Sequence, residues 1–122
     1  MKVLLSIKPE YAEKILSGYK KYEFRKKLFK NPMVKKVIIY ASSPIQKVVG
    51  EFDIEYILSL EPETLWEKTE RYSGVDKEFY DSYFNGKEIG HAIKVKKTKR
   101  YRKQLDLRDF DIEYAPQSFV YI

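Results

Sequence analysis

The sequence predicts an α+β domain, a small mixed and partly open β-barrel with inserted and flanking helices. Two observations predict this fold class. Several segments alternate polar and apolar residues or are rich in β-branched residues, which is typical of strands. Other segments repeat apolar residues at helical spacing. With 122 residues, the chain is long enough for one hydrophobic core, so we expect a single domain over residues 1–122.

The first third of the chain predicts a strand, a helix and a second strand. Residues 2–7 are mostly apolar and β-branched, which favours a short strand. A helix is expected over residues 9–17, because Pro9 suits the first helical turn and Gly18 suits the left-handed position after the last one. Residues 22–25 then alternate aromatic and charged side chains, so this strand should have one aromatic and one charged face.

Two more strands and two helices are expected in the middle of the chain. Residues 34–41 form a nearly continuous β-branched and aromatic run, which predicts a buried strand. Residues 47–58 alternate apolar and acidic side chains, and Gly50 within them indicates a bulge or a close backbone approach. The helices that follow begin at Pro62 and at the capping residue Asp76.

The last of these helices carries a stripe of four aromatic residues, Phe79, Tyr80, Tyr83 and Phe84. We interpret the stripe as core packing rather than as a platform on which bases stack, because its spacing is strictly helical. The rest of the chain predicts a long strand or hairpin, a turn or short helix, and a last strand, over residues 87–104, 106–111 and 118–122.

Charge is distributed unevenly along the chain. The formal net charge is +6, with +9 over residues 1–50, −7 over residues 51–81 and +4 over residues 82–122. If the first and last segments meet in space, one side of the molecule attracts polyanions. The alternative is a solvated surface of mixed charge.

Composition excludes several kinds of site. There is no cysteine and a single histidine, His91, so neither disulfides nor a metal site is expected. We interpret His91 as a core or pocket-wall residue, because it lies on an apolar strand face. No apolar run approaches the ~20 residues that span a bilayer, and the amino terminus lacks a signal-peptide pattern. We therefore expect a cytoplasmic protein without a membrane partner and without a cofactor.

A basic segment stands out near the end of the chain. Residues 94–103 include seven cationic side chains, among them Lys97, Arg100 and Arg102. Lysine-rich edge strands also protect sheets from aggregation. Additional lysines in residues 26–36 favour a broader phosphate-binding surface, whose affinity would be sensitive to salt and largely independent of base sequence.

The octet at residues 18–25 brings a lysine, a carboxylate and a guanidinium to one place, namely Lys20, Glu23 and Arg25. One interpretation is an exposed ion-pair ladder that contributes ~1 kcal/mol or less. The other is a polar pocket beneath the helix end, in which Lys20 and Arg25 hold a phosphate or base edge and Glu23 orients them.

The spacing Gly-x-Lys-x-x-Glu-x-Arg in this octet resembles the signature of the ASCH domain, a branch of the PUA-like superfamily of small β-barrels. Residues 5–12, 40–44, 48–51 and 116–119 also resemble that family in order and spacing. The resemblance favours the pocket interpretation. It also implies a pocket wall that includes Lys8, Tyr40, Ser42 and Ser118.

The resemblance implies a small RNA-binding module whose cleft takes an unpaired or modified nucleoside. RNA is therefore the expected partner, and a small nucleoside is a second candidate ligand. The residues expected to contact nucleic acid are Lys8, Lys20, Arg25, Lys26, Lys27, Lys97, Arg100 and Arg102.

An enzyme is the alternative. Some ASCH-like relatives deacetylate 4-acetylcytidine with the motif lysine, a threonine and a separate glutamate, and others are described as ribonucleases. Here Glu23 holds the threonine position, so catalysis would use Lys20 and Glu23, with Glu23 as general base toward water. Glu51 is our candidate for the second glutamate. A further alternative is a protein-interaction module in transcription or translation, because oppositely charged faces suit docking.

Overall fold

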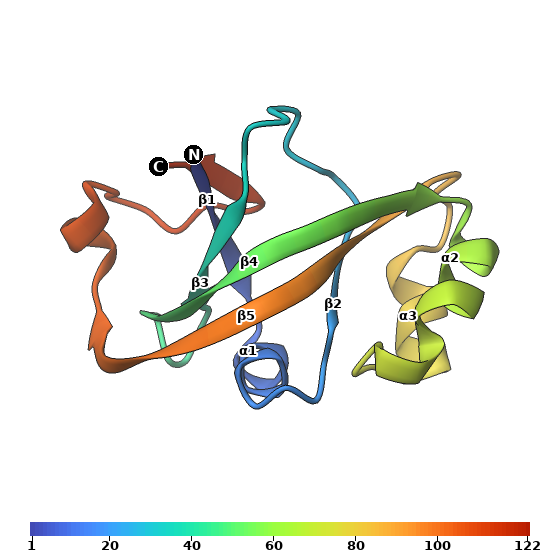
Figure 1. Ribbon diagram of the computed structural model, residues 1–122, viewed down its shortest axis with the longest axis horizontal. Coiled ribbons are helices and arrows are strands. Elements are labelled where there is room, and N and C mark those ends of the chain that lie inside the picture. Colours follow the sequence, from blue (N-terminus) through green and yellow to red (C-terminus); the bar gives the residue numbers. More distant parts are fainter.

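The computed structural model describes residues 1–122 as one curled six-stranded sheet with three α-helices (Figure 1). The strands lie in the order β2-β5-β4-β3-β1-β6. This half-barrel confirms the predicted α+β class. Its elements are β1 (Lys2–Ile7), α1 (Pro9–Leu16), β2 (Tyr22–Arg25), β3 (Lys36–Ala41), β4 (Lys47–Leu60), α2 (Pro62–Thr69), the 3₁₀ turn η1 (Glu70–Tyr72), α3 (Lys77–Tyr83), β5 (Gly90–Leu105), the 3₁₀ turn η2 (Leu107–Phe110) and β6 (Phe119–Tyr121).

The two longest strands, β4 and β5, form the spine of the sheet, and both ends of the chain meet at β1 and β6 (Figure 1). Only β1 and β3 pair in parallel; every other pair is antiparallel. The connection from β1 to β3 passes through α1 and β2, so β2 joins the far edge of the sheet next to β5. The curled sheet therefore brings β2 round toward β1.

The predicted choice between a strand and a hairpin after residue 87 resolves as one continuous strand, β5. Asp53 pairs with Lys96 and Phe52 with Thr98, so Lys97 lies between them without a partner on β4. Its left-handed backbone (φ 49°) is that of a β-bulge, which bends a strand without reversing it.

Gly50 confirms the prediction of an irregular and crowded position. The β4 register shifts beside it, and a Cβ there would lie 2.6 Å from the carbonyl oxygen of Lys99 and 2.8 Å from a methyl group of Leu16. Only glycine fits where helix α1 lies this close to the sheet.

Two hydrophobic clusters determine the position of the site. The larger lies between α1 and the inner face of the sheet, where Ala12, Ile15 and Leu16 cover the strands. The second joins Tyr22 and Phe24 of β2 to the helices α2 and α3. Strand β2 therefore separates the two clusters, and its alternate residues Glu23 and Arg25 face away from the second one, as the alternation predicts.

Candidate functional site

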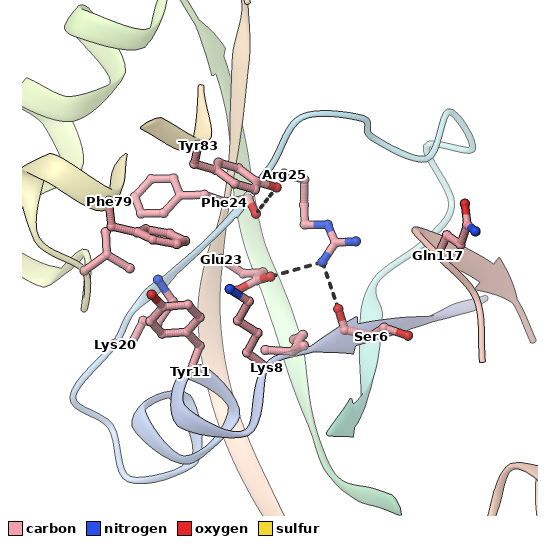
Figure 2. A pocket seen from close by; sticks show the side chains of 12 residues that line it. Ser6, Lys8, Tyr11, Lys20, Glu23, Phe24, Arg25, Phe79, Tyr83 and Gln117 are labelled. Atoms are coloured by element: carbon pink, nitrogen blue, oxygen red, sulfur yellow. Dashed lines mark hydrogen bonds and ion pairs between the residues drawn. The ribbon is translucent and has the colours of Figure 1, made fainter. Parts of the chain in front are cut away.

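A cavity of about 220 Å³ lies where α1, β2 and α3 converge (Figure 2). It contains four of the residues predicted for the pocket, Lys8, Lys20, Glu23 and Arg25, together with aromatic side chains of α3. Its lining consists of Ser6, Ile7, Lys8, Tyr11, Lys20, Glu23, Phe24, Arg25, Val75, Phe79, Tyr83 and Gln117.

The turn between α1 and β2 positions Lys20. Gly18 has a left-handed φ of 85°, as its place after the helix predicts. The N–H groups of Tyr19 and Lys20 both donate to the carbonyl oxygen of Lys14, at 2.9 Å. This tight turn directs the Lys20 side chain under the loop that precedes α3.

Lys20 is 2 % exposed, and it is the most buried cation of the chain. Its Nζ donates to the carbonyl oxygen of Ser73 at 2.5 Å and lies 4.8 Å from the centre of the Phe24 ring. Burial lowers the pKa of Lys20 to about 8, although the nearby charge of Glu23 opposes this effect. The Lys20 ammonium therefore loses its proton at a lower pH than an exposed lysine does.

The loop before α3 is docked onto the α1–β2 turn by three consecutive carbonyl groups. The carbonyl oxygens of residues 72, 73 and 74 accept hydrogen bonds from the Lys21 N–H, the Lys20 Nζ and the Lys14 Nζ. Gly74 is required there, because a Cβ would lie 2.6 Å from the Lys20 side chain and its φ is 70°. These contacts join the segment that contains α2 and α3 to the α1–β2 turn at one end of the cavity.

Arg25 connects the two edges of the curled sheet. Its guanidinium donates to Glu23 Oε2 at 3.2 Å, to the carbonyl oxygen of Ser6 on β1 at 3.2 Å, and to the carbonyl oxygen of Ser118 at 2.9 Å. Both side chains of the ion pair are largely buried, at 12 % exposure for Arg25 and 7 % for Glu23. The exposed ladder considered from the sequence is therefore not what forms.

Aromatic side chains of α3 form one wall of the cavity (Figure 2). The rings of Phe79 and Tyr83 are stacked, with centres 5.9 Å apart and planes 16° from parallel. The Nζ of Lys8 lies 5.4 Å from the Phe79 ring centre, and that of Lys26 lies 4.7 Å from the Tyr83 ring centre. Each of the two rings therefore has a lysine ammonium near it.

The interpretation of the aromatic stripe as core packing holds fully for two of its residues and in part for the other two. Tyr80 and Phe84 are buried in the second cluster, at 1 % and 3 % exposure. Phe79 and Tyr83 are half-buried and line the cavity. Helical spacing alone does not distinguish these pairs, because the stripe is wide enough to cover the core with one edge and the cavity with the other.

Three predicted wall residues do not line the cavity. Tyr40 is buried in a third cluster on the other side of the sheet, beneath η2. Ser42 lies in the turn after β3, where its N–H donates to the carbonyl oxygen of Ile7. Ser118 contributes only its backbone carbonyl, to Arg25. The resemblance placed these residues by sequence segment, but the pleat of the strand and the path of the loop determine where a side chain points.

Ser6 and Gln117 are lining residues that sequence reasoning missed. Gln117 sits in the loop before β6, and Ser6 holds that loop through a 2.7 Å hydrogen bond from its hydroxyl to the carbonyl oxygen of Pro116. Both belong to segments that carry the family resemblance, which was the available signal.

Glu51 does not reach the cavity. It accepts hydrogen bonds from Lys36 Nζ at 2.5 Å and from the Tyr101 hydroxyl at 2.8 Å. Glu51 therefore belongs to an ion-paired group on β3, β4 and β5. The prediction of Glu51 as a second catalytic glutamate beside Lys20 and Glu23 is therefore wrong.

Most of the basic segment of β5 is exposed, but its members differ in whether an acidic side chain already neutralises them. Arg100 forms two hydrogen bonds with the Glu13 carboxylate of α1, at 2.9 and 2.6 Å. Lys97 and Arg102 are exposed and form no ion pair. The same holds for Lys27 in the loop after β2.

His91 lies beside the cavity strand without lining the cavity. It pairs with Arg25 in the β2–β5 register, and its Nδ1 shares a 2.7 Å hydrogen bond with the Ser59 hydroxyl. Burial lowers its pKa. No group of three or more His, Cys, Asp or Glu side chains is arranged to hold a metal ion, and none of the helices has the length and hydropathy to cross a membrane.

The half-barrel fold is shared with solved structures. The crystal structure of ASCH from Zymomonas mobilis superimposes with a TM-score of 0.90 at 27 % identity, over 99 % of this chain and 87 % of that one. The N-terminal domain of Staphylothermus marinus McrB has a TM-score of 0.57 at 13 % identity, a similarity of fold alone. The ASCH domain model matches residues 5–99, and the chain belongs to the ASCH domain family.

Proteins of several descriptions contain a similar sequence. The chain is 32 % identical over 90 residues to an ASCH domain-containing ribonuclease of Zymomonas mobilis, which covers 74 % of this chain and 61 % of that protein. It is 32 % identical over 120 residues to large ribosomal subunit protein uL22 of Ureaplasma parvum, and 36 % identical over 121 residues to an ATP synthase subunit alpha of that species. The chain spans only 39 % and 15 % of the lengths of these last two.

Proposed function

We propose that this ASCH domain binds single-stranded RNA and takes one nucleotide into the cavity. The observation that carries the proposal is the composition of the cavity. An aromatic wall of Phe79 and Tyr83 shares one hollow with the cations Lys8, Lys20 and Arg25 and the carboxylate Glu23. Proteins read RNA mainly through unpaired bases, which stack on aromatic rings and form hydrogen bonds through their edges.

Five side chains of the cavity have a role in this proposal. Phe79 and Tyr83 stack on the base. Glu23 and the guanidinium N–H groups of Arg25 that the interior does not use bind the base edge. Lys8 is exposed and contacts the phosphate. A volume of about 220 Å³ is below the roughly 300–1,000 Å³ typical of pockets for drug-sized ligands, which suits one nucleoside.

The exposed cations outside the cavity extend the contact along the phosphate backbone. Lys26 and Lys27 follow the cavity strand β2, and Lys97 and Arg102 are exposed on β5. Arg100 is left out of this set, because Glu13 already neutralises it.

Fluorescence anisotropy with labelled single-stranded RNA tests the proposal. Phe79→Ala should weaken binding at least fivefold, since a base stacked on an aromatic ring contributes about 1–3 kcal/mol. The double variant Lys97→Ala/Arg102→Ala should reduce the slope of log affinity against log salt by about 0.7 for each lost phosphate contact. Arg100→Ala is the matched control on the same strand, and its slope should equal that of the wild type. Equal affinity of Phe79→Ala and wild type would refute the cavity as the nucleotide site.

The cavity also supports a second candidate function, cleavage of RNA. The favouring observation is a buried amine, Lys20, beside a carboxylate, Glu23, with the pKa of Lys20 lowered by burial to about 8. A group that exchanges its proton near working pH is suited to general acid–base catalysis. In addition, one relative is a ribonuclease by name.

In this candidate reaction, Glu23 takes the proton of a ribose 2′-hydroxyl, and the oxygen attacks the adjacent phosphorus. The bond to the 5′-oxygen breaks, and Lys20 donates its proton to that leaving oxygen. The products are a 2′,3′-cyclic phosphate and a 5′-hydroxyl. Glu23→Gln should abolish cleavage of end-labelled RNA but retain most of the binding, because the Gln amide oxygen still accepts a hydrogen bond from the base edge and the aromatic wall is unchanged. A parallel incubation with 4-acetylcytidine tests the amidohydrolase alternative. RNA that stays intact with the wild type excludes the nuclease reaction.

A further inference from the structure

A second hollow lies beside the cavity, on the outside of the α1–β2 turn. Its volume is about 410 Å³, and its lining includes Tyr19, Lys21, Arg71 and Tyr72. Val75 lines both this hollow and the cavity, so the two are neighbours separated by the loop before α3. Nothing in the proposed binding of one nucleotide uses this second hollow.

The two tyrosines of this hollow are large aromatic residues left in solvent. Tyr19 is 69 % exposed and Tyr72 is 41 % exposed. Neither sits on a loose segment. The Tyr19 N–H donates to the carbonyl oxygen of Lys14, and the Tyr72 carbonyl accepts from the N–H of Lys21. Both rings are therefore presented by backbone that is held in place, which lowers the entropic cost of binding.

Cations surround these rings. The Nζ of Lys21 lies 4.8 Å from the Tyr72 ring centre, and the Arg71 guanidinium lies 5.5 Å from the same centre. The Nζ of Lys14 lies 5.9 Å from the Tyr19 ring centre. Three cations face one carboxylate, Glu70, in the lining. Aromatic rings interleaved with cations are what single-stranded nucleic acid requires, with bases on the rings and phosphates on the cations.

We infer that this hollow is a second nucleotide subsite, which holds the nucleotide next to the one in the cavity. The inference rests on the proposed RNA binding and extends it. In this arrangement the RNA crosses the loop at residues 73–75. The flanking base stacks on Tyr19 or Tyr72. Lys21 and Arg71 contact the phosphate that links the two nucleotides. Binding should therefore strengthen when the ligand grows from one nucleotide to two or more.

The experiment measures affinity as a function of ligand length. Fluorescein-labelled RNAs of mixed sequence, one, two, four and six nucleotides long, are titrated with the wild type and with Tyr19→Ala, Tyr72→Ala and the double variant. The double variant should bind the hexanucleotide at least fivefold more weakly than the wild type does, whereas the affinity for the single nucleotide should not change. Tyr19→Phe and Tyr72→Phe keep the ring and should retain wild-type affinity.

Tyr114→Ala is the matched control. Tyr114 is 82 % exposed, but its hollow contains Asp111 and Glu113 against the single cation Arg108, so its loss should not affect any length of RNA. If the double variant binds the hexanucleotide as tightly as the wild type does, the second subsite is refuted while the cavity proposal stands. If the wild type binds neither the single nucleotide nor the hexanucleotide, the proposed function is refuted and the subsite with it.

Discussion

Lys20 is 2 % exposed, and burial lowers its pKa to about 8 from its ordinary 10.5. Below pH 8 the folded and unfolded chains both carry this proton, so the folded state bears the full cost of a buried charge. Between pH 8 and 10.5 the folded chain releases the proton and the unfolded chain keeps it. Because the unfolded state then binds more protons, this group makes the free energy of unfolding rise with pH.

The gap between the two pKa values corresponds to about 3 kcal/mol, at 1.36 kcal/mol for each pH unit. Most of that gap lies between pH 7 and pH 10. Lys20→Met removes the titrating group and keeps most of the side-chain volume. The unfolding free energy of Lys20→Met minus that of the wild type should therefore fall by about 2–3 kcal/mol from pH 7 to pH 10.

Urea unfolding at pH 7, 8.5 and 10, followed by the fluorescence of the single tryptophan, Trp66, measures this difference. Tyrosines that titrate at high pH contribute to both proteins and cancel. Lys21→Met, at the exposed neighbouring residue, is the control, and its profile should parallel that of the wild type. A constant difference between Lys20→Met and wild type across this range would show that Lys20 is not buried as a cation near neutral pH.

Three further predictions concern the stability of the folded chain. Arg25→Lys loses the fork that binds two backbone carbonyls across the sheet edges and should lower the free energy of unfolding in urea by about 2 kcal/mol. Gly74→Ala should lower the free energy of unfolding by about 2–4 kcal/mol, because its Cβ would meet the Lys20 side chain. Gly86→Ala, with φ 81° and open space around it, should lower it by only about 1 kcal/mol. Equal losses of stability in thermal denaturation would contradict the crowding by Lys20. Burial alone would raise the pKa of Glu51, but hydrogen bonds from Lys36 and Tyr101 lower it, so its stabilising effect is present above about pH 4.5 and is lost as pH falls through the folded pKa. Lys36→Met should therefore be less stable than the wild type at pH 7. The difference should shrink as pH falls through the folded pKa values of Glu51 and of Asp53, the second carboxylate that Lys36 binds.

The order of elements was predictable because it depends on local signals. Pro9 and Gly18 delimit α1, and the alternation over residues 22–25 defines β2 and assigns its two faces. Gly50 likewise predicted a bulge or a close backbone approach, and the structure shows both. In each case the signal and the structure involve neighbouring residues, so no knowledge of the tertiary fold is needed.

The partners of the charged residues were not predictable in the same way. Arg100 belongs to a basic run in the sequence, but in space it is neutralised by Glu13, 87 residues away. Glu51 was a candidate for catalysis, but Lys36 and Tyr101 hold it far from the cavity. Such pairings depend on the strand register and on the curl of the sheet, and the local sequence pattern specifies neither.

The sequence by itself determined the class of fold, the approximate positions of most helices and strands, and the closeness of Lys20, Glu23 and Arg25 at the α1–β2 turn and the strand after it. Only the tertiary structure decided that Lys20 is buried under Gly74, that Arg25 joins the sheet edges, and that Phe79 and Tyr83 face a cavity while Tyr80 and Phe84 face the core. The physical reason is that periodicity specifies which residues share a face of an element. What that face contacts depends on how distant segments pack, which local sequence does not encode.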